Sequence, residues 1–247
     1  RDGNTKVGLF PDNSFGKSET QNFFNYGVKA GVTYKLDGRN YLVANGSYRT
    51  RAPYANESFV SPRVRDQIVQ NLTNEKITSG EISYLARYTN LKARVTAFYT
   101  NFEDKISNDV FYHEEFRTFV NYLMTGIDRR HTGLEMGLEY QLNNNFAFVV
   151  AGSLGQYIHT SRPSATISRD NSAEDFVHDR TIYINNYYVA GIPQNAGTIG
   201  LQFDKDYWFL NVNVNGFSKN YLSFNPDRRT AEAVEGISLP EQADLFN

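Results

Sequence analysis

Side chains that could bind a metal or perform catalysis are scattered along this chain. The four histidines, His113, His131, His159 and His178, lack partners two or four residues away, which is the spacing that builds a zinc site. No cysteine is present, so thiolate metal sites, disulfides and cysteine nucleophiles are excluded. No serine lies in a nucleophile elbow. We therefore expect no enzyme active site, no metal and no cofactor.

One acidic segment could supply oxygen ligands to calcium. It contains Asp170, Glu174, Asp175 and Asp179. These residues lack the ordered spacing of an EF-hand loop, and a calcium cage needs its ligands to converge. We therefore interpret the segment as a solvated loop. The remaining chemistry that the sequence offers is non-covalent binding.

Alternating apolar residues indicate the elements that must position any binding site. Residues 78–101 form two such stretches, joined by Thr89-Asn90. If that dipeptide is a two-residue hairpin turn, Tyr84 pairs with Val95 on an apolar face and Arg87 pairs with Lys92 on a largely polar face. A sheet with these two faces suits a boundary between membrane and water.

Three further hairpins repeat the pattern. Residues 26–36 align with the strand after Asp37-Gly38-Arg39, residues 134–140 align with the strand after Asn143-Asn144-Asn145, and the last hairpin turns at Asp204-Lys205. The sequence thus predicts about eight antiparallel strands, with short turns at one end and long polar connections at the other. The long connections cover roughly residues 51–76, 103–117, 161–187 and 222–247.

Aromatic residues gather beside the short turns, where an interfacial girdle belongs. They are Tyr34, Tyr41, Tyr88, Tyr140, Phe146, Phe203, Tyr207 and Trp208. The girdle and the loop asymmetry favour an all-β, antiparallel transmembrane β-barrel with short periplasmic turns and long extracellular loops. The alternative is a soluble β-sandwich binding module or a lipocalin-like barrel, since its core would also give one apolar face.

Composition sets further bounds. The chain has 25 Lys and Arg against 27 Asp and Glu, a formal net charge of -2, so nothing indicates a nucleic-acid partner. Its mean hydropathy is -0.53. No run of about 18 apolar residues exists, which excludes helical membrane spans. A transmembrane barrel stays allowed, because only alternate residues of its strands face lipid.

Three motifs then occur in a specific order. They are Arg51-Ala52-Pro53, Asn71-Leu72-Thr73-Asn74-Glu75-Lys76 and Gly133-Leu134-Glu135. Together they resemble the β-barrel of TonB-dependent outer-membrane receptors. In that family the first motif opens an extracellular loop, the second enters the next strand, and the third lies on a later strand. The resemblance covers most of residues 20–225.

Other segments bring the resemblance closer to the receptors of Bacteroidetes. They are Phe10-Pro11-Asp12-Asn13-Ser14, Gly191-Ile192-Pro193-Gln194 and Asn225-Pro226-Asp227-Arg228-Arg229. The resemblance implies a roughly 22-stranded barrel with an N-terminal plug domain. This chain shows no signal peptide, no plug and too few strands, and it lacks a final strand ending on an aromatic residue. We expect residues 1–247 to form the later part of such a barrel.

The resemblance also implies a location in the outer membrane and TonB-dependent uptake of a nutrient ligand, either a glycan, a peptide or an iron complex. The implied partners are outer-membrane lipid, the receptor's own plug domain, the TonB complex and, as in some receptors of Bacteroidetes, a surface lipoprotein. The alternative function is a structural or adhesive barrel that transports no solute.

Extracellular loops would carry the ligand specificity. Their aromatic and basic side chains are Tyr54, Phe59, Arg63 and Arg65 in the first loop, Phe111, Tyr112, His113, Phe116 and Arg117 in the second, and Tyr183, Tyr187 and Tyr188 in the third. Rings beside hydrogen-bonding groups suit sugars, peptides and aromatic iron chelates alike. The alternative is that these rings pack within their own loops.

Charged residues on the polar face should look into the barrel lumen. They are Lys29, Lys35, Glu81, Arg87, Lys92, Arg94, Glu135 and Glu139. They could hold the plug by ion pairs or be solvated. The facing pair Arg87 and Lys92 repel each other unless an acidic group lies between them. We expect a plug carboxylate or luminal water to relieve that repulsion.

Overall fold

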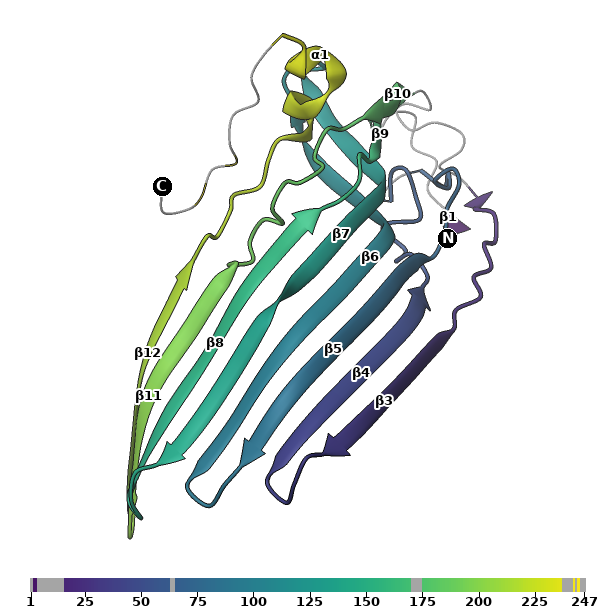
Figure 1. Ribbon diagram of the computed structural model, residues 1–247. Coiled ribbons are helices and arrows are strands. Elements are labelled where there is room, and N and C mark those ends of the chain that lie inside the picture. The colour runs from purple at the N-terminus through teal and green to yellow at the C-terminus, as the bar shows by residue number, and fades with distance from the viewer. Residues whose placement is uncertain are drawn as a thin grey trace.

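A single curved, antiparallel sheet dominates the computed structural model (Figure 1). The structure describes residues 2–3, 16–62, 65–169, 175–236, 242 and 244. The strands of the sheet follow the order β12-β11-β8-β7-β6-β5-β4-β3. They are β3 (Gly27–Lys35), β4 (Asn40–Arg51), β5 (Glu75–Arg87), β6 (Leu91–His113), β7 (Thr118–Gln141), β8 (Phe146–His159), β11 (Asn195–Lys205) and β12 (Trp208–Ser218). This eight-strand path confirms the predicted fold class.

Shorter elements lie at the end with the long connections. Strand β9 (Ser164–Ser168) pairs with β7 and with β10 (Asp175–Thr181), while β1 (Asp2–Gly3) pairs with β2 (Gly16–Lys17). The 3₁₀ helix η2 (Pro226–Arg229) and the helix α1 (Ala231–Val234) follow β12.

The sheet is open, because β3 and β12 each have one strand neighbour among the described residues. A β-sandwich needs two sheets packed face to face, so the single curved sheet excludes the soluble sandwich alternative. Within the described residues no helix has the length and apolar character needed to cross a membrane.

Three of the four predicted hairpins have the predicted register. Tyr34 pairs with Leu42, Tyr84 with Val95, and Arg87 with Lys92. The hairpin of β7 and β8 pairs Leu134 with Leu154, as its alternating apolar residues require. Register was predictable here because a slip of one residue would turn every apolar side chain to the other face.

The prediction for the last hairpin was wrong by two residues at the turn. The turn consists of Asp206 and Tyr207 instead of Asp204-Lys205, so Leu201 pairs with Val212. Asp206 adopts a φ of 53°, the left-handed conformation that aspartate tolerates at turns. The pairing moved by an even number of residues, so the apolar faces still coincide and periodicity alone could not detect the error.

Two predicted loops contain strands. Residues 103–113 continue β6, and the segment 161–187 contains β9 and β10. In β9 the alternation of buried Ala165 and Ile167 with more polar residues supports pairing with β7. Polar residues around these strands made the segments resemble solvated loops, whereas the alternating apolar residues decide the structure.

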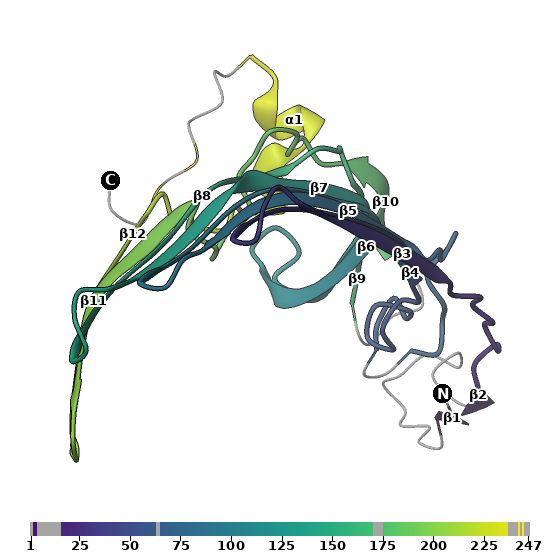
Figure 2. The same ribbon diagram turned by 60° about the horizontal axis from the view of Figure 1, so that its bottom comes forward.

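The two faces of the sheet differ in chemistry and in curvature. Exposed apolar side chains such as Val28, Ile82 and Leu154 share one face at positions that alternate with the charged residues. Arg51 lies on the charged face and contacts Glu57 in the connection after β4, which lies on the concave side of the sheet (Figure 2). The apolar face is therefore convex, as in the lipid-facing wall of a barrel.

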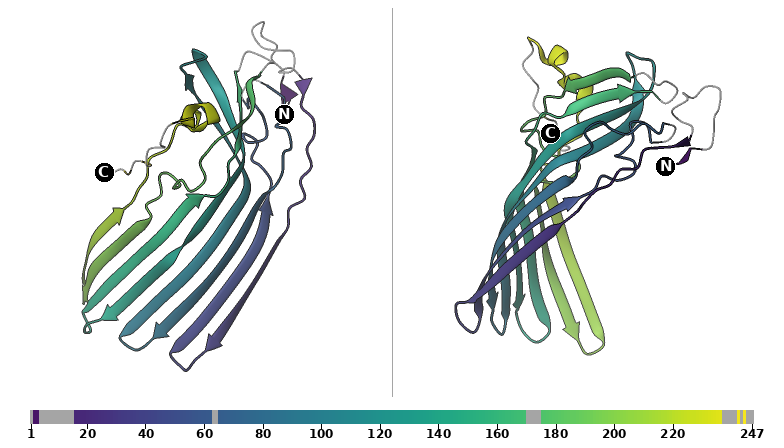
Figure 3. Two further views of the ribbon diagram at one scale, coloured as in Figure 1. Left: turned by 45° about the horizontal axis from the view of Figure 1, so that its top comes forward. Right: turned by 90° about the vertical axis from the view of Figure 1, so that its right-hand side faces the viewer.

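The exposed apolar side chains of the convex face form a band that ends before the strands reach the long connections. Along β7 the outward positions change from Leu134 to Thr132 and then to Arg130, towards the long connections. The short turns lie at the opposite end of every strand (Figures 1 and 3). We call the end with the long connections the mouth of the sheet.

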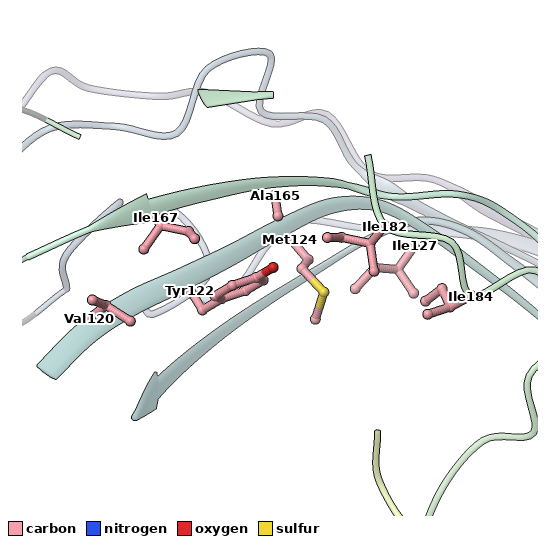
Figure 4. Packing of buried hydrophobic residues seen from close by; sticks show 8 residues of the cluster. All are labelled: Val120, Tyr122, Met124, Ile127, Ala165, Ile167, Ile182 and Ile184. Carbon is pink, nitrogen blue, oxygen red and sulfur yellow. The ribbon is translucent and has the colours of Figure 1, made fainter. Parts of the chain in front are cut away.

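Buried residues concentrate at the mouth. The larger cluster contains Tyr122, Ile127, Ile167, Ile182 and other residues of β7, β9 and the segment after β10 (Figure 4). A second cluster joins Val60 and Val69 of the connection after β4 to β6 and to Leu123. Tyr122 and Leu123 alternate along β7, so both faces of this part of β7 are covered.

Candidate functional site

The mouth is built on the long strands β6 and β7, which contain 23 and 24 residues. Their pairing is interrupted twice, first by an extra residue in β6 beside Asp104 and then by one in β7 beside Gly126. Paired bulges of this kind bend a strand and increase its twist. The two strands therefore continue beyond their neighbours and turn across the concave side (Figure 2).

A cavity of about 340 Å³ lies between the bulged strands, the connection after β4, and the β9–β10 hairpin. Its apolar part consists of Val60, Val69, Ile106 and Leu123, the residues of the second cluster. Its polar part consists of Gln67, Gln70, Asn71, Thr73, Asp104, Thr125, Thr166, His178 and Asp179. The volume lies within the range of small-molecule sites, about 300–1,000 Å³.

The cavity is shaped by residues with left-handed backbone conformation. Asn71, Asp104 and Asp179 have φ angles of 54°, 59° and 51°, and Gly126 has 72°. All four line the cavity. Such conformations cost roughly 1–2 kcal/mol for residues other than glycine, and they persist where the surrounding structure enforces them. Asparagine, aspartate and glycine adopt them most readily, which explains the residue types at these positions.

Two basic residues that do not line the cavity, Lys76 and Arg65, bind side chains that do. The Lys76 ammonium lies 2.8 Å from the Asp104 carboxylate, whose hydrogen bond raises the pKa of Lys76. The fully buried Arg65 donates to the side-chain oxygen of Gln67. The Asp104 amide donates to Asp128 at 3.0 Å. These bonds fix Asp104 and Gln67 in the cavity wall.

The wall offers amides, hydroxyls and carboxylates to a bound molecule. Neither lysine nor arginine is among the described residues that line it. Hydrogen-bonding groups over an apolar base favour a neutral polar ligand, and Asp179 disfavours an anionic one, since the Asp104 carboxylate is already paired with Lys76. In the described parts of the chain, no three His, Asp or Glu side chains come together as a metal site would require.

A profile of the family described as "TonB dependent receptor-like, beta-barrel" matches residues 2–239. The chain belongs to this family. The family consists of outer-membrane receptors, which agrees with the convex apolar face and with the all-β architecture. The closer resemblance to receptors of Bacteroidetes stays a prediction.

A solved structure similar to this receptor chain is "Copper transporter OprC". The two agree with a TM-score of 0.55 at 17% sequence identity, over 79% of this chain and 27% of the transporter. At this identity the likeness shows the fold alone. The matched region is a minor part of the length of that protein. No curated protein matches the sequence.

Tyr54, Phe59 and Arg65, the described ligand candidates of the first receptor loop, are not among the residues that line the cavity. Tyr54 is 60% exposed, with the Arg51 guanidinium 4.0 Å from its ring centroid. Phe59 forms an isolated bridge with Ile68, and Arg65 is buried. Arg63 lies outside the described residues. The structure thus places Phe59 and Arg65 within the packing of their own loop, and their role in ligand binding remains a prediction.

The second set is divided between a packed group and an exposed tip. His113 is buried, stacks on Phe116 at 4.4 Å, and lies beside Phe111. Tyr112 and Arg117 are exposed at the tip of the β6–β7 hairpin. The packed group supports the alternative that these rings stabilise their own loop.

The third set packs against the segment after β12. The guanidinium of Arg229 lies 4.4 Å from the ring centroid of Tyr187, and Tyr188 stacks on Tyr221 at 4.1 Å. The Tyr183 amide donates to the carbonyl of Arg229 at 2.7 Å. Each ring is partly buried, so these tyrosines hold the C-terminal segment against the mouth.

The predicted luminal charges lie on β3 to β7, at positions that alternate with the convex apolar residues. They are Lys29, Lys35, Glu81, Arg87, Lys92, Arg94, Glu135 and Glu139. Asn45 donates to Glu81 at 2.7 Å, and the Arg94 guanidinium lies 3.7 Å from the same carboxylate. Contacts within the sheet therefore satisfy part of this charged face.

The facing cations Arg87 and Lys92 have neighbours within the sheet, and the approach of a plug carboxylate or luminal water to them stays a prediction. Glu139 of the next strand pairs with Lys92, and its carboxylate lies 3.0 Å from the ammonium. The Arg87 guanidinium lies 5.6 Å from the ring centroid of Tyr41. Each cation thus has a favourable neighbour inside the sheet. The pairing of a single hairpin could not reveal these neighbours, because they lie on the strands next to that hairpin.

Sequence reasoning missed the polar residues of the cavity. Gln67, Gln70 and Thr166 are common loop and strand residues, and the search for aromatic and basic side chains passed over them. The available signal was the segment Asn71–Thr73 directly before β5, together with Asp104 and Gly126 as residues suited to left-handed conformations. The contact between three distant segments was not visible in the sequence.

Proposed function

We propose that this chain forms the later part of the barrel wall of an outer-membrane transporter driven by the TonB complex, and that the mouth cavity binds part of its ligand. The observation that carries the proposal is the cavity itself, which lies at the mouth of a sheet of the TonB-dependent receptor family. Transport needs binding and gating but no covalent chemistry, which agrees with a lining of amides and hydroxyls.

The proposed ligand is neutral and rich in hydroxyl or amide groups at the part that enters the cavity. Gln70, Asn71, Thr125 and Thr166 offer both donors and acceptors. Asp179 would repel a phosphate or carboxylate, whereas the charge of Asp104 is offset by Lys76. Among the three predicted ligand classes, this favours a glycan or peptide over an anionic iron complex.

The remainder of the proposed receptor completes the wall. The unpaired edges of β3 and β12 among the described residues expose backbone donors and acceptors that a membrane cannot satisfy. Further strands of the same barrel would pair with them. The plug domain would occupy the concave side, where Glu81, Arg94 and Glu135 lie.

The test is ligand binding by the full-length receptor in detergent, with variants that remove single hydroxyl groups from the cavity. Thr166→Val and Thr125→Val keep the side-chain shape and remove a hydrogen-bonding group. Each should weaken binding of a neutral oligosaccharide or peptide by about two- to tenfold, as expected for about 0.5–1.5 kcal/mol per hydrogen bond. Uptake by cells carrying these variants should fall in parallel.

Thr33→Val is the matched control, because Thr33 lies on β3 far along the sheet from the cavity. It should bind as the parent receptor does. Equal affinity for all three variants would remove the cavity from the ligand site. A complete receptor that shows no TonB-dependent uptake of any such ligand would contradict the transport function itself, whatever the cavity binds.

A second candidate function is adhesion, and one observation favours it. Tyr112 and Phe119 form an exposed edge-to-face pair at the tip of the β6–β7 hairpin, with 53% and 61% of their surfaces accessible. Exposed aromatic pairs commonly anchor protein partners. Loss of cell attachment in Tyr112→Ser, with uptake unchanged, would support adhesion by the tip.

A further inference from the structure

Three glycines lie side by side on the convex face of the last strands. Gly152 of β8 pairs with Gly197 of β11, and Gly197 pairs with Gly216 of β12. On its other side Gly152 pairs with Met136 of β7. The same row continues through Val95 and Tyr84, so large side chains give way to glycine along a single line across the sheet.

The glycine row is the base of a hollow of about 560 Å³. Val150, Ile199 and Val214 border it on one side, and Leu134 and Leu154 border it on the other. The border residues project strongly, since Leu154 and Val214 are 64% and 72% exposed. β-Branched side chains have few rotamers in a strand, so this hollow is formed before anything enters it.

Backbone strain explains none of the glycines of this row, and crowding does not explain Gly197 or Gly216. No left-handed φ is found at Gly152, Gly197 or Gly216. An added Cβ would meet only a backbone oxygen at 3.5 Å at Gly197 and nothing within 4 Å at Gly216, whereas at Gly152 it would lie 3.3 Å from the terminal methyl of the flexible Met136 side chain. On the concave face the situation is different, because Asn45 and Asn213 lie over Gly31 and Gly200. The glycines of the convex row therefore leave a hollow, whereas Gly31 and Gly200 on the concave face are covered by asparagine side chains.

We propose that this hollow binds one fatty acyl chain of an outer-membrane lipid. The inference rests on the proposed membrane location, because it requires the convex face to meet lipid. The hollow is continuous with the convex apolar band, and its border residues are hydrocarbon side chains. An acyl chain in the hollow contacts its base and both of its sides, whereas a chain on a flat surface is contacted from one side only.

The dimensions favour a single chain over a protein segment. Val150 and Leu154 are four residues apart on β8, which places their Cα atoms about 13 Å apart before their side chains narrow the gap. A helix with side chains is about 10 Å across and would not fit between them. From Met136 to Gly216 the row crosses three strand spacings, about 14 Å, which is long enough to hold part of an acyl chain along its length.

A polar edge borders the hollow towards the mouth. Asn195 and Ser218 are the outward residues of the next row, and the Asn195 amide donates to the Ser218 hydroxyl at 3.1 Å. Hydrogen-bonding groups here would lie beside the polar part of a lipid whose chain enters the hollow. Because lipid tails and leucine side chains are equally apolar, the stabilisation comes from dispersion contacts and from filling the void.

The test uses the full-length receptor in nanodiscs of phosphatidylethanolamine that contain a phosphatidylcholine with a photoactivatable diazirine in one acyl chain. Cross-linked residues are mapped by mass spectrometry. Labelling of Met136, Ile199 and Val214 should exceed labelling of Val32 and Ile82, which lie on the same convex face outside the hollow. In Gly197→Val and in Gly216→Val the excess should be lost.

Gly46→Val is the matched control, since Gly46 is also an outward glycine, where an added Cβ would meet only a backbone oxygen at 3.9 Å, but it lies on β4. It should keep the excess labelling in the hollow. Heat-modifiable migration in gels checks that each variant is folded. Even labelling over the convex face, or an excess that survives both hollow variants, would overturn the inference. Complete absence of labelling on the convex face would contradict the membrane location as well.

Discussion

The carboxylate of Asp227 lies 2.9 Å from the imidazole Nε2 of His113. Asp227 belongs to η2 after the last strand, whereas His113 ends β6 at the tip of the longest hairpin. Tyr122 lies beside them, and burial together with the Asp227 charge raises the pKa of its hydroxyl. This contact ties the C-terminal segment to the mouth.

Loss of the Asp227 carboxylate should release the C-terminal segment. In Asp227→Ala the buried His113 imidazole loses its neighbour, at a cost of about 1–3 kcal/mol for an unsatisfied buried polar group. Amide exchange of residues 219–236 should become faster while the exchange of β4 and β5 stays unchanged. Asp206→Ala, in a short turn at the other end of the sheet, serves as a control. Unchanged exchange in residues 219–236 would show that the contact does not hold the segment.

Acidification should weaken the mouth through His159. Burial, with Arg129 and His131 nearby, lowers the pKa of His159 to about 3. An unfolded histidine has a pKa of about 6.5 and takes up a proton first, so the stability contributed by neutral His159 is present above about pH 6.5 and is lost as the pH falls towards 3. The unfolding temperature of His159→Gln should therefore depend less on pH between 7 and 4. A parallel pH dependence in parent and variant would contradict this assignment.

Arg51 should be the most important cation of the first loop. Its Nε lies 2.6 Å from the Glu75 carboxylate, which is 6% exposed, and it also contacts Glu57. Arg51→Met leaves a buried carboxylate unpaired and should lower the free energy of unfolding by about 3 kcal/mol. Lys92→Met removes an exposed pair with Glu139 and should cost at most about 1 kcal/mol. Urea denaturation distinguishes the two, and equal losses would argue against a special role of Arg51.

Any side chain at Gly126 should strain the backbone of the bulge. Its φ of 72° would cost an L-residue roughly 1–2 kcal/mol, so Gly126→Ala should be destabilised by that amount and should bind ligand more weakly. Gly137→Ala lies on the same strand with nothing within 4 Å of the added Cβ and no left-handed φ. It should be neutral. Denaturation and ligand titration of both variants check the expectation.

The membrane-facing part of the fold was predictable from the sequence because its rule is local. Alternation with a period of two residues fixed the pairs of Tyr84 with Val95 and of Leu134 with Leu154. The same rule allowed the even-numbered error at Asp204-Lys205, since both registers give one apolar face. Only the turn conformation of Asp206 separates them.

The mouth was not predictable in the same way. Extra residues beside Asp104 and Gly126 shift the pairing of β6 with β7, and no periodic pattern shows such a shift. The contact of His113 with Asp227 joins residues far apart in the chain. Tyr187 and Phe116, which the sequence suggested as ligand contacts, pack partly against the buried cluster of the mouth, and their role in ligand binding stays a prediction. The cavity depends on these long-range contacts, so its polar residues could not be selected from sequence alone.

The placement of this sheet as a membrane wall with an outward mouth is tested most directly by cysteine labelling in intact cells. The chain contains no cysteine, so single substitutions give unique sites within it. A membrane-impermeant maleimide should label Glu114→Cys at the exposed tip of β6 and β7, and should label Asn144→Cys in a short turn only after the outer membrane is opened. Ile82→Cys, exposed on the convex face, should stay unlabelled because lipid covers it. Labelling of Ile82→Cys or of Asn144→Cys in intact cells would contradict this placement.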